Sequence, residues 1–254
     1  HRPEDMGLLP DGATPLPGSP ESGDFSGRDR RVASFAEEPA WGRAQASHTG
    51  AFRALILLSS LIPFVQAGVN FHIYPFLTDQ GFGEMIAVTV LSTFAVFGMV
   101  GSAVWGMLSE RFRLQSLLAV NLIGNGLIFL LLYWAVQFKF DGLSGMAIVF
   151  ALASLHGIFH GGRNPMIPTL WANFFGRNSL GSIYSLSGPF YFTANAVGPF
   201  FGGLCYDLLG SYAFPFHLFV VLFLLSGIVA HRLKPPAAIP PVPAGREGGH
   251  SGMP

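Results

Sequence analysis

Cysteine and charge are scarce in this sequence. Cys205 is the one cysteine among 254 residues, which excludes an intramolecular disulfide and any cysteine-based zinc site. Charged residues make up 11% of the chain, against about 25% in an ordinary soluble domain. The formal net charge is zero, so no excess of positive charge points to a nucleic-acid partner.

Carboxylates are missing from the interiors of the apolar stretches. All 14 Asp and Glu residues fall in loops, in tails or at the ends of those stretches. No paired carboxylates, Ser/His/Asp set or glycine-rich cofactor loop occurs, so we expect no enzyme, no catalytic residue and no cofactor. Within this chain, a group that titrates near neutral pH at membrane depth would have to be one of four histidines: His72, His156, His160 or His217.

What the chain has in abundance is apolar residues, which make up 50% of it. Six apolar runs are each about as long as the roughly 20 residues that cross a bilayer as a helix. Gly and Pro recur inside them, which membrane helices tolerate. The sequence therefore predicts an all-α membrane protein with six transmembrane helices, near Arg53–Phe76, Met85–Leu108, Gln115–Val136, Ser144–Met166, Ser182–Tyr206 and Phe214–His231.

The flanks of the apolar region differ from it in composition. Residues 1–50 are rich in Pro, Gly, Ser and charge, and residues 235–254 are rich in Pro and Gly without an apolar pattern. Such segments cannot bury enough apolar surface to fold alone. We expect a flexible loop at 1–50, a six-helix domain at 51–234 and a disordered tail at 235–254.

Lys and Arg predict the orientation of the helices, because cytoplasmic loops are enriched in both. If the first helix leaves the cytoplasm, Lys139 is the one basic residue of the outer loops, beside Asp79, Asp141 and Asp207. Both ends of the chain then lie in the cytoplasm. The inner side carries Arg43, Arg53, Arg111, Arg113, Arg177, Arg232 and Lys234.

Two similar motifs indicate an internal repeat. Gly106–Glu110 closes the second predicted helix and Gly203–Asp207 closes the fifth, and both read Gly-x-x-x-acid. Each lies at the end of the middle helix of a three-helix group, at about 51–137 and 143–233. Because three is odd, the two groups cross the membrane in opposite directions. Inverted repeats of this kind are typical of secondary transporters.

Several motifs resemble the carboxy-terminal half of a bacterial major facilitator superfamily transporter. Gly106–Arg113 is similar to that superfamily's loop motif G-x-L-x-D-R-x-G-R-R, with Glu110 for Asp, Arg113 for Gly and Leu114-Gln115 for the basic pair. The run from Trp171 to Ser182, with Gly198-Pro199 and Asp207–Tyr212, resembles monocarboxylate- and oxalate/formate-type members.

Arg2–Gly12 resembles the stretch after the sixth helix of such carriers, which would make residues 1–50 the central cytoplasmic loop. The resemblance implies that a partner half of six helices is missing and that the chain, which begins with His1, is a fragment. It also implies a gating or loop role for Gly106, Glu110, Arg111, Arg113 and Asp207.

The stretch Ala151–Thr169 carries the most unusual polar residues of the apolar region. His156, His160 and Arg163 are spaced i, i+4, i+7, which predicts one face of a helix. Polar and charged groups inside a membrane normally face a bundle interior or a watery cavity. The alternatives are that these side chains join helices or that Arg163 reaches the headgroups or clamps a carbonyl. The His-x-x-x-His spacing lacks an accompanying Asp, Glu or Cys, so we predict no metal site.

By analogy with the superfamily fold, the first, second, fourth and fifth helices of this half face the cavity. The predicted substrate-binding residues are therefore Gln66, Asn70, His156, His160, Arg163, Tyr191 and Asn195. Asn121 and Asn125, one turn apart on the third helix, are expected instead to form hydrogen bonds between helices.

The sequence thus predicts half of a secondary active carrier in the inner (plasma) membrane, whose partners are a small organic solute and lipid. Arg163 makes an organic anion such as a monocarboxylate plausible, because guanidinium pairs with carboxylates. A membrane enzyme and a non-transporting scaffold or receptor of the same fold are the competing readings.

The charge asymmetry leads to a topology prediction. In a Cys205→Ala background, a cysteine at Asp141 should react with an impermeant thiol reagent added outside intact cells, and one at Arg177 should not. The reverse labelling pattern would contradict the predicted orientation.

Overall fold

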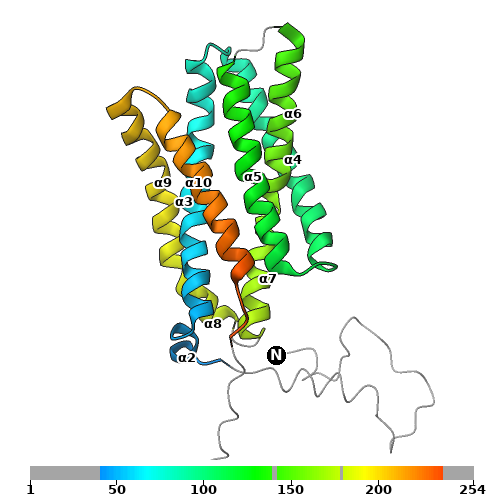
Figure 1. The fold of residues 1–254 in the computed structure, drawn as a ribbon, viewed down its shortest axis with the longest axis vertical. Helices are drawn as coiled ribbons and strands as arrows, with labels where there is room; N and C mark the ends of the chain where they lie inside the picture. The colour runs from blue at the N-terminus through cyan, green and yellow to red at the C-terminus, as the bar shows by residue number, and fades with distance from the viewer. Residues whose placement is uncertain (1–40, 139–141, 178–179, 237–254) are drawn as a thin grey trace, which may run out of the picture. The chain divides into compact units, whose positions relative to one another are not determined.

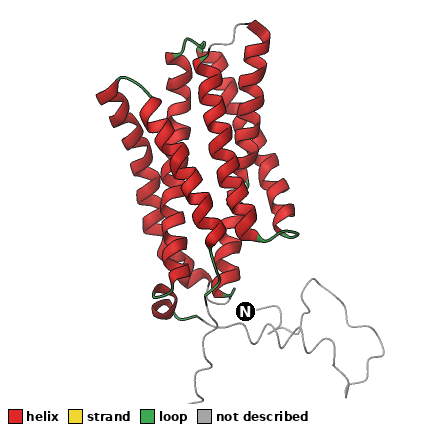
Figure 2. Cartoon of the chain, in the orientation of Figure 1, coloured by secondary structure: helices red, strands yellow, loops and turns green. Residues whose placement is uncertain are grey.

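A bundle of long helices makes up the described part of the chain, which in this computed structural model comprises residues 41–138, 142–177 and 180–236. Within these ranges every regular element is a helix (Figures 1 and 2). The elements are α2 (Arg43–Ser47), α3 (Gly50–Asp79), α4 (Glu84–Ser109), α5 (Leu114–Gln137), α6 (Gly142–Gly161), α7 (Arg163–Phe175), α8 (Leu180–Tyr184), the 3₁₀ turn η3 (Ser185–Ser187), α9 (Gly188–Leu209) and α10 (Ala213–Arg232). The predicted outer-loop residues Lys139 and Asp141, most of the predicted loop at 1–50 and most of the tail lie outside the described residues.

Five helical segments in the described ranges are long and apolar enough to cross a membrane. They are α3, α4, α5, α10 and the combined segment Leu143–Phe175, so the described residues contain several helical segments with the length and composition of membrane spans. The remaining predicted span, Ser182–Tyr206, falls on α8, η3 and α9. Although α9 has 22 residues, its Asn, Thr, Tyr and Gly residues lower its mean hydropathy, and it is not among the five. Its crossing of the membrane stays a prediction.

The fourth predicted helix, Ser144–Met166, is interrupted and longer than expected. Helix α6 ends at Gly161, and α7 begins at Arg163 and continues to Phe175. Pro165 has no N–H to donate to the Gly161 carbonyl, which breaks the hydrogen-bond ladder at this point. Gly162 keeps helical angles (φ −63°, ψ −24°), so the chain continues in nearly the same direction. The expectation of one continuous helix ending at Met166 was therefore wrong.

The long helices pack in three pairs. Helix α3 lies along α9, α4 along α6, and α5 along α10, while α5–α6 and α3–α10 contacts join the pairs (Figure 1). We number the spans in chain order, with α6–α7 as one span and α9 included. The first span then pairs with the fifth, the second with the fourth and the third with the sixth. If the first three spans are exchanged with the last three, the same set of pairs results.

Glycine permits the closest approaches within two of these pairs. A Cβ added to Gly161 of α6 would collide with the backbone of Gly98 in α4, and one added to Gly198 of α9 would collide with the backbone at Phe64 in α3. Small residues at membrane helix crossings let two backbones touch and gain dispersion energy. These contacts hold α4 against α6 and α3 against α9, and so fix the walls of the cavity described below.

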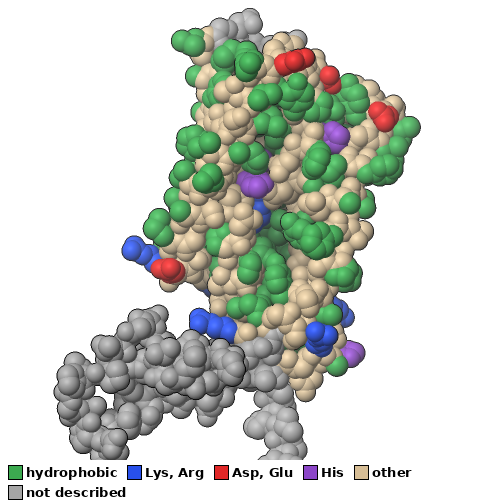
Figure 3. Space-filling view, turned by 180° about the vertical axis from the view of Figure 1, so that it is seen from behind, with side chains coloured by type: hydrophobic (Ala, Val, Ile, Leu, Met, Phe, Trp, Pro, Cys, Tyr) green, Lys and Arg blue, Asp and Glu red, His purple; other side chains and the backbone are tan. Residues whose placement is uncertain are grey.

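Charged side chains gather at the two ends of the bundle, and exposed apolar side chains cover the surface between them (Figure 3). Asp79, Glu84 and Asp207 lie near one end, where α3 and α9 finish and α4 begins. The other end holds the basic residues of the α4–α5 turn and of the α7 and α10 ends, and we call it the arginine end. Trp41 closes this end by packing edge-on against Phe175, at 5.6 Å between ring centroids.

The Gly161 crossing can be tested by stability. Gly161→Ala should lower the thermal unfolding temperature of the purified chain, because overpacking in a tight contact costs about 1–3 kcal/mol. Gly106→Ala is the matched control, since nothing lies within 4 Å of the Cβ it would add to α4. Equal unfolding temperatures for the two variants would contradict the close crossing.

Candidate solute-binding cavity

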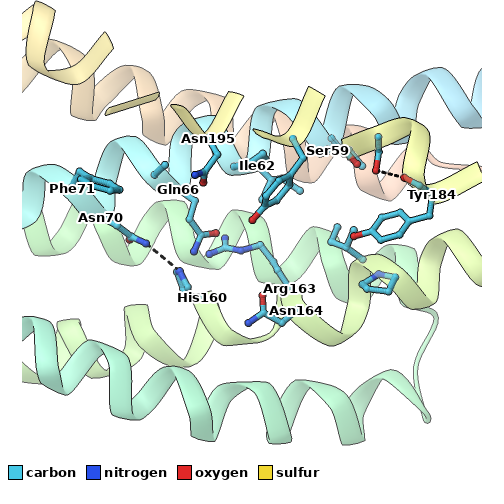
Figure 4. A pocket seen from close by; sticks show the side chains of 17 residues that line it. Ser59, Ile62, Gln66, Asn70, Phe71, His160, Arg163, Asn164, Tyr184 and Asn195 are labelled. Carbon is cyan, nitrogen blue, oxygen red and sulfur yellow. Dashed lines mark hydrogen bonds between the residues drawn. The ribbon is translucent and has the colours of Figure 1, made fainter. Parts of the chain in front are cut away.

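A cavity of about 380 Å³ lies among α3, the last turn of α6, α7, α8, η3 and α9 (Figure 4). Its volume falls in the usual range of roughly 300–1,000 Å³ for small-molecule sites. Apolar and polar side chains both reach it. The lining comprises Leu58, Ser59, Ile62, Pro63, Gln66, Ala67, Asn70, Phe71, His160, Arg163, Asn164, Ile167, Pro168, Tyr184, Ser187, Tyr191 and Asn195.

Six of the seven predicted substrate-binding residues line this cavity, and the helices bring them together from distant parts of the chain. They are Gln66, Asn70, His160, Arg163, Tyr191 and Asn195. The seventh, His156, lines a separate cavity of about 230 Å³ instead. The two cavities meet at Asn70, which lines both. Whether these residues bind a substrate stays a prediction.

Arg163 is the most unusual group in the lining. Its side chain is only 4% exposed, and none of its three guanidinium nitrogens has a hydrogen-bond partner among the described residues. The residue lies roughly 30 Å from one end of its 33-residue helical segment and roughly 18 Å from the other, at about 1.5 Å per residue. An unpaired charge at such a position is costly and normally has a functional reason.

One contact partly compensates the Arg163 charge. The guanidinium carbon lies 5.3 Å from the ring centroid of Phe223 in α10, within the range of a cation–π interaction. A ring face attracts the cation but accepts none of its five N–H groups in a strong hydrogen bond. In Figure 4 the Arg163 side chain reaches toward the space beside Gln66. The Arg163 N–H groups are therefore buried without acceptors among the described residues, beside a cavity that Arg163 lines.

A polar contact between helices marks one end of the cavity. Asn70 of α3 and His160 of α6 are joined by a hydrogen bond of 3.3 Å between Nδ2 and Nε2 (Figure 4). Because an amide NH₂ can only donate, the imidazole Nε2 accepts and the ring proton lies on Nδ1. The Asn70 Oδ1 atom has no hydrogen-bond partner among the described residues. This pair therefore ties α3 to α6 while keeping one acceptor available.

His156 lies one helical turn beyond His160, on the far side of that contact. It is 2% exposed and stacks on Phe94 of α4, with ring centroids 5.1 Å apart. Phe94 also meets His160 edge-on at 4.7 Å. His156 and His160 share a helical face as predicted, but the cavity ends at His160. The predicted grouping of all three stripe residues at one site is therefore not what the structure shows.

Sequence reasoning left out several lining residues. Asn164 follows Arg163 directly, and Tyr184 lies on the face that continues through Tyr191 and Asn195 at helical spacing. Because the sequence already shows that Tyr184, Tyr191 and Asn195 share a helical face, Tyr184 could have been predicted as a lining residue. Asn164 could have been found from its position beside Arg163, before Pro165.

The prediction for Asn121 and Asn125 is confirmed. Both side-chain amides donate from α5 to backbone carbonyls of α6: Asn121 to Phe159 at 2.7 Å and Asn125 to His156 at 3.3 Å. His72 forms a similar bridge, since its Nε2 lies 2.9 Å from the Pro199 carbonyl of α9. These polar groups position the helices around the cavity and do not line it.

The predicted loop-motif residues lie away from the cavity. Gly106 is in the last turn of α4, Glu110 caps that helix and Arg113 is the N-cap of α5. Arg111 lies between them in the turn. Asp207, in the matching motif of α9, is at the opposite end of the bundle (Figure 1). Their gating role stays a prediction.

Comparison with known proteins gives a distant relative. The chain is 25% identical to "Monocarboxylate transporter 12-B" of Danio rerio over 230 residues, which are 81% of this chain and 44% of that protein. The chain thus spans less than half of the relative's length. No protein-family model matches the chain. The relative is named as a transporter, and the five apolar helical segments of the described residues are compatible with a multi-pass membrane protein.

The cavity predicts a pattern of chemical access. In the purified, detergent-solubilised Cys205→Ala chain, a cysteine at Asn195 should react readily with a charged, water-soluble thiol reagent, because Asn195 lines the cavity. A cysteine at Asn125, which is fully buried in the α5–α6 contact, should react far more slowly. Similar rates at the two positions would show that Asn195 does not face an aqueous space.

Proposed function

We propose that this chain is the carboxy-terminal half of a twelve-helix secondary carrier of the major facilitator type. The carrier would move a small organic anion, with monocarboxylates as the favoured class, across the plasma membrane or its bacterial counterpart, the inner membrane. The buried and unpaired guanidinium of Arg163, at the wall of a 380 Å³ cavity, carries this proposal. The similarity to a monocarboxylate transporter supports it independently.

A carboxylate fits the chemistry of the cavity. Guanidinium N–H groups pair with the two carboxylate oxygens in parallel, and such charge-assisted bonds are about twice as strong as neutral ones. The amides of Gln66 and Asn195 and the hydroxyl of Tyr191 can orient the rest of a small solute. The apolar lining from Leu58, Ile62 and Ile167 leaves room for a short carbon chain. Among the residues that the structure describes, no Asp or Glu lines the cavity to compete for Arg163.

The arrangement of the helices supports alternating access between two halves. The pairing of helices is unchanged when the first three are exchanged with the last three, as expected for two inverted repeats. The middle helices of the two groups, α4 and α9, both leave many side chains exposed, among them Met99 and Phe200. In the complete carrier these surfaces would pack against the other six-helix half and close the open side of the cavity. The arginine end would face the cytoplasm, with both ends of this chain on that side.

Substitution of Arg163 tests the proposal in the complete carrier. Arg163→Gln should lower the apparent affinity for a transported carboxylate about 10- to 100-fold, since a charge-assisted hydrogen bond contributes roughly 1.5–3 kcal/mol. Arg163→Lys keeps the charge but loses the planar fork, so its effect should be smaller. Uptake of a radiolabelled panel of small carboxylates, with surface expression quantified, gives the measurement.

Arg53→Gln serves as the matched control, because it removes an exposed arginine near the arginine end of α3. It should leave uptake unchanged. If Arg163→Gln folds and takes up carboxylates with wild-type affinity, Arg163 is structural and the site assignment fails. If the unaltered carrier takes up no carboxylate of the panel, the result favours the alternative that the protein is a non-transporting scaffold or receptor.

A further inference from the structure

The smaller space of about 230 Å³, which we call the chamber, continues beyond the solute cavity on the side away from the arginine end. It lies among α3, α4, α5 and α6, and most of its lining is apolar. Along α6 the cavity is lined by His160, whereas the chamber is lined by Ala153 and His156. Both chamber residues are 2% exposed, so the chamber is enclosed within the bundle.

A hydrogen bond and an aromatic ring lie at the boundary between the two spaces. Asn70 lines both of them, and its Nδ2 donates to Nε2 of His160 (Figure 4). At 3.3 Å this bond is longer than the usual 2.7–3.2 Å of a protein hydrogen bond, and longer bonds are weaker. Phe94 of α4 stacks on His156 and meets His160 edge-on. The separation of the cavity from the chamber therefore depends on few contacts.

The helices on the two sides of this boundary belong to different close-packed pairs. Helix α3 packs along α9 and α4 along α6, whereas α3 and α6 do not pack along each other. Glycine crossings at Gly198 and Gly161 hold each pair together. The helical ladder is interrupted directly after His160, because α6 ends at Gly161. The α4–α6 pair can therefore shift against the α3–α9 pair without opening either glycine crossing.

A second partner for Asn70 lies one helical turn from the first. His156 shares the face of His160 and is about 6 Å from it along α6, at about 1.5 Å per residue. Its Nδ1 atom is buried without a hydrogen-bond partner among the described residues, and so is the Asn70 Oδ1 atom. An amide and an imidazole can pair in either direction, since each can supply a donor or an acceptor. A shift of about one turn would thus exchange one hydrogen bond for another, as in other one-turn transitions between packed helices.

We propose that Asn70 is a movable latch between the cavity and the chamber. In the structure it pairs with His160, and the two spaces are separate. In a second state it pairs with His156, so that the space beside His160 opens and the cavity and chamber join into one passage. This inference rests on the proposed function, because such a passage serves a carrier, but it does not depend on the identity of the solute.

The reactivity of a cysteine in the chamber tests the latch without any solute. In a cysteine-free form of the complete carrier in detergent, Ala153→Cys should react slowly with a small charged methanethiosulfonate. His160→Leu removes the present partner of Asn70 and favours the joined state. It should raise the reaction rate about three- to ten-fold, as expected for the loss of one hydrogen bond. His156→Leu removes the second partner and should lower the rate by a similar factor.

Matched variants separate the latch from a general loosening of the bundle. His160→Gln keeps an acceptor for Asn70 and should react at nearly the unaltered rate. His72→Leu removes a histidine that joins α3 to α9 but lines neither space, so it should leave the rate unchanged. Ala119→Cys, at a 4% exposed position outside both spaces, should not respond to His160→Leu. In an Asn70→Leu background, His160→Leu should add no further change, because the bond is already absent.

Three results would overturn the inference. If His160→Leu raises the rate at Ala153→Cys no more than His72→Leu does, the Asn70–His160 contact does not separate the spaces. If His156→Leu raises the rate as His160→Leu does, Asn70 does not exchange partners. If His160→Leu still raises the rate in the Asn70→Leu background, its effect does not pass through Asn70. Each result can occur while Arg163→Gln still weakens uptake, so the latch can fail without the proposed function failing.

Discussion

A positive charge without a counter-ion, held inside an apolar helix bundle, sets the main requirement on this structure. The Arg163 guanidinium is buried, its nitrogens have no hydrogen-bond partner among the described residues, and it lies over the ring of Phe223. Burying a charge without a partner is among the most costly arrangements in a protein. The cost is lowest if the guanidinium meets water or an anion in the adjacent cavity, so the cavity and the charge are best understood together.

The rest of the bundle supports that cavity. Close crossings at Gly161 and Gly198 hold α4 on α6 and α3 on α9, so that the residues of α3, α7 and α9 face one space. Asn121 and Asn125 join α5 to α6 behind it. The Asn70–His160 hydrogen bond joins α3 to α6 within the lining itself. Polar side chains therefore link helices both behind the cavity and at its wall.

The membrane character of the fold could be predicted from sequence because apolar length is a local property. The packing role of Asn121 and Asn125 was also predictable, since two amides one turn apart on a mostly apolar helix need partners. The break at Gly162 was not predicted, because the apolar run continues across it and Pro165 alone marks the loss of a donor to the Gly161 carbonyl.

The candidate site was harder to predict because it depends on the position of a residue along its helix as well as on the helical face. His156 shares the face of His160, yet the Asn70–His160 contact ends the cavity between them. No spacing rule within α6 reveals that limit, which is set by a residue 90 positions away along the chain. Gln66 and Asn195 were grouped with Arg163 through the family resemblance, since periodicity within one helix says nothing about its neighbours.

The central claim is that Arg163 holds the carboxylate of a solute, and a direct contact measurement tests it. Solid-state NMR of the complete carrier in lipid, with ¹⁵N-labelled arginine and a ¹³C-carboxylate solute identified by uptake, detects a guanidinium within hydrogen-bonding distance of the bound carboxylate. The account predicts a ¹³C–¹⁵N dipolar contact that disappears in Arg163→Lys. Bound carboxylate with no contact to an arginine, or a contact that persists in Arg163→Lys, would contradict it.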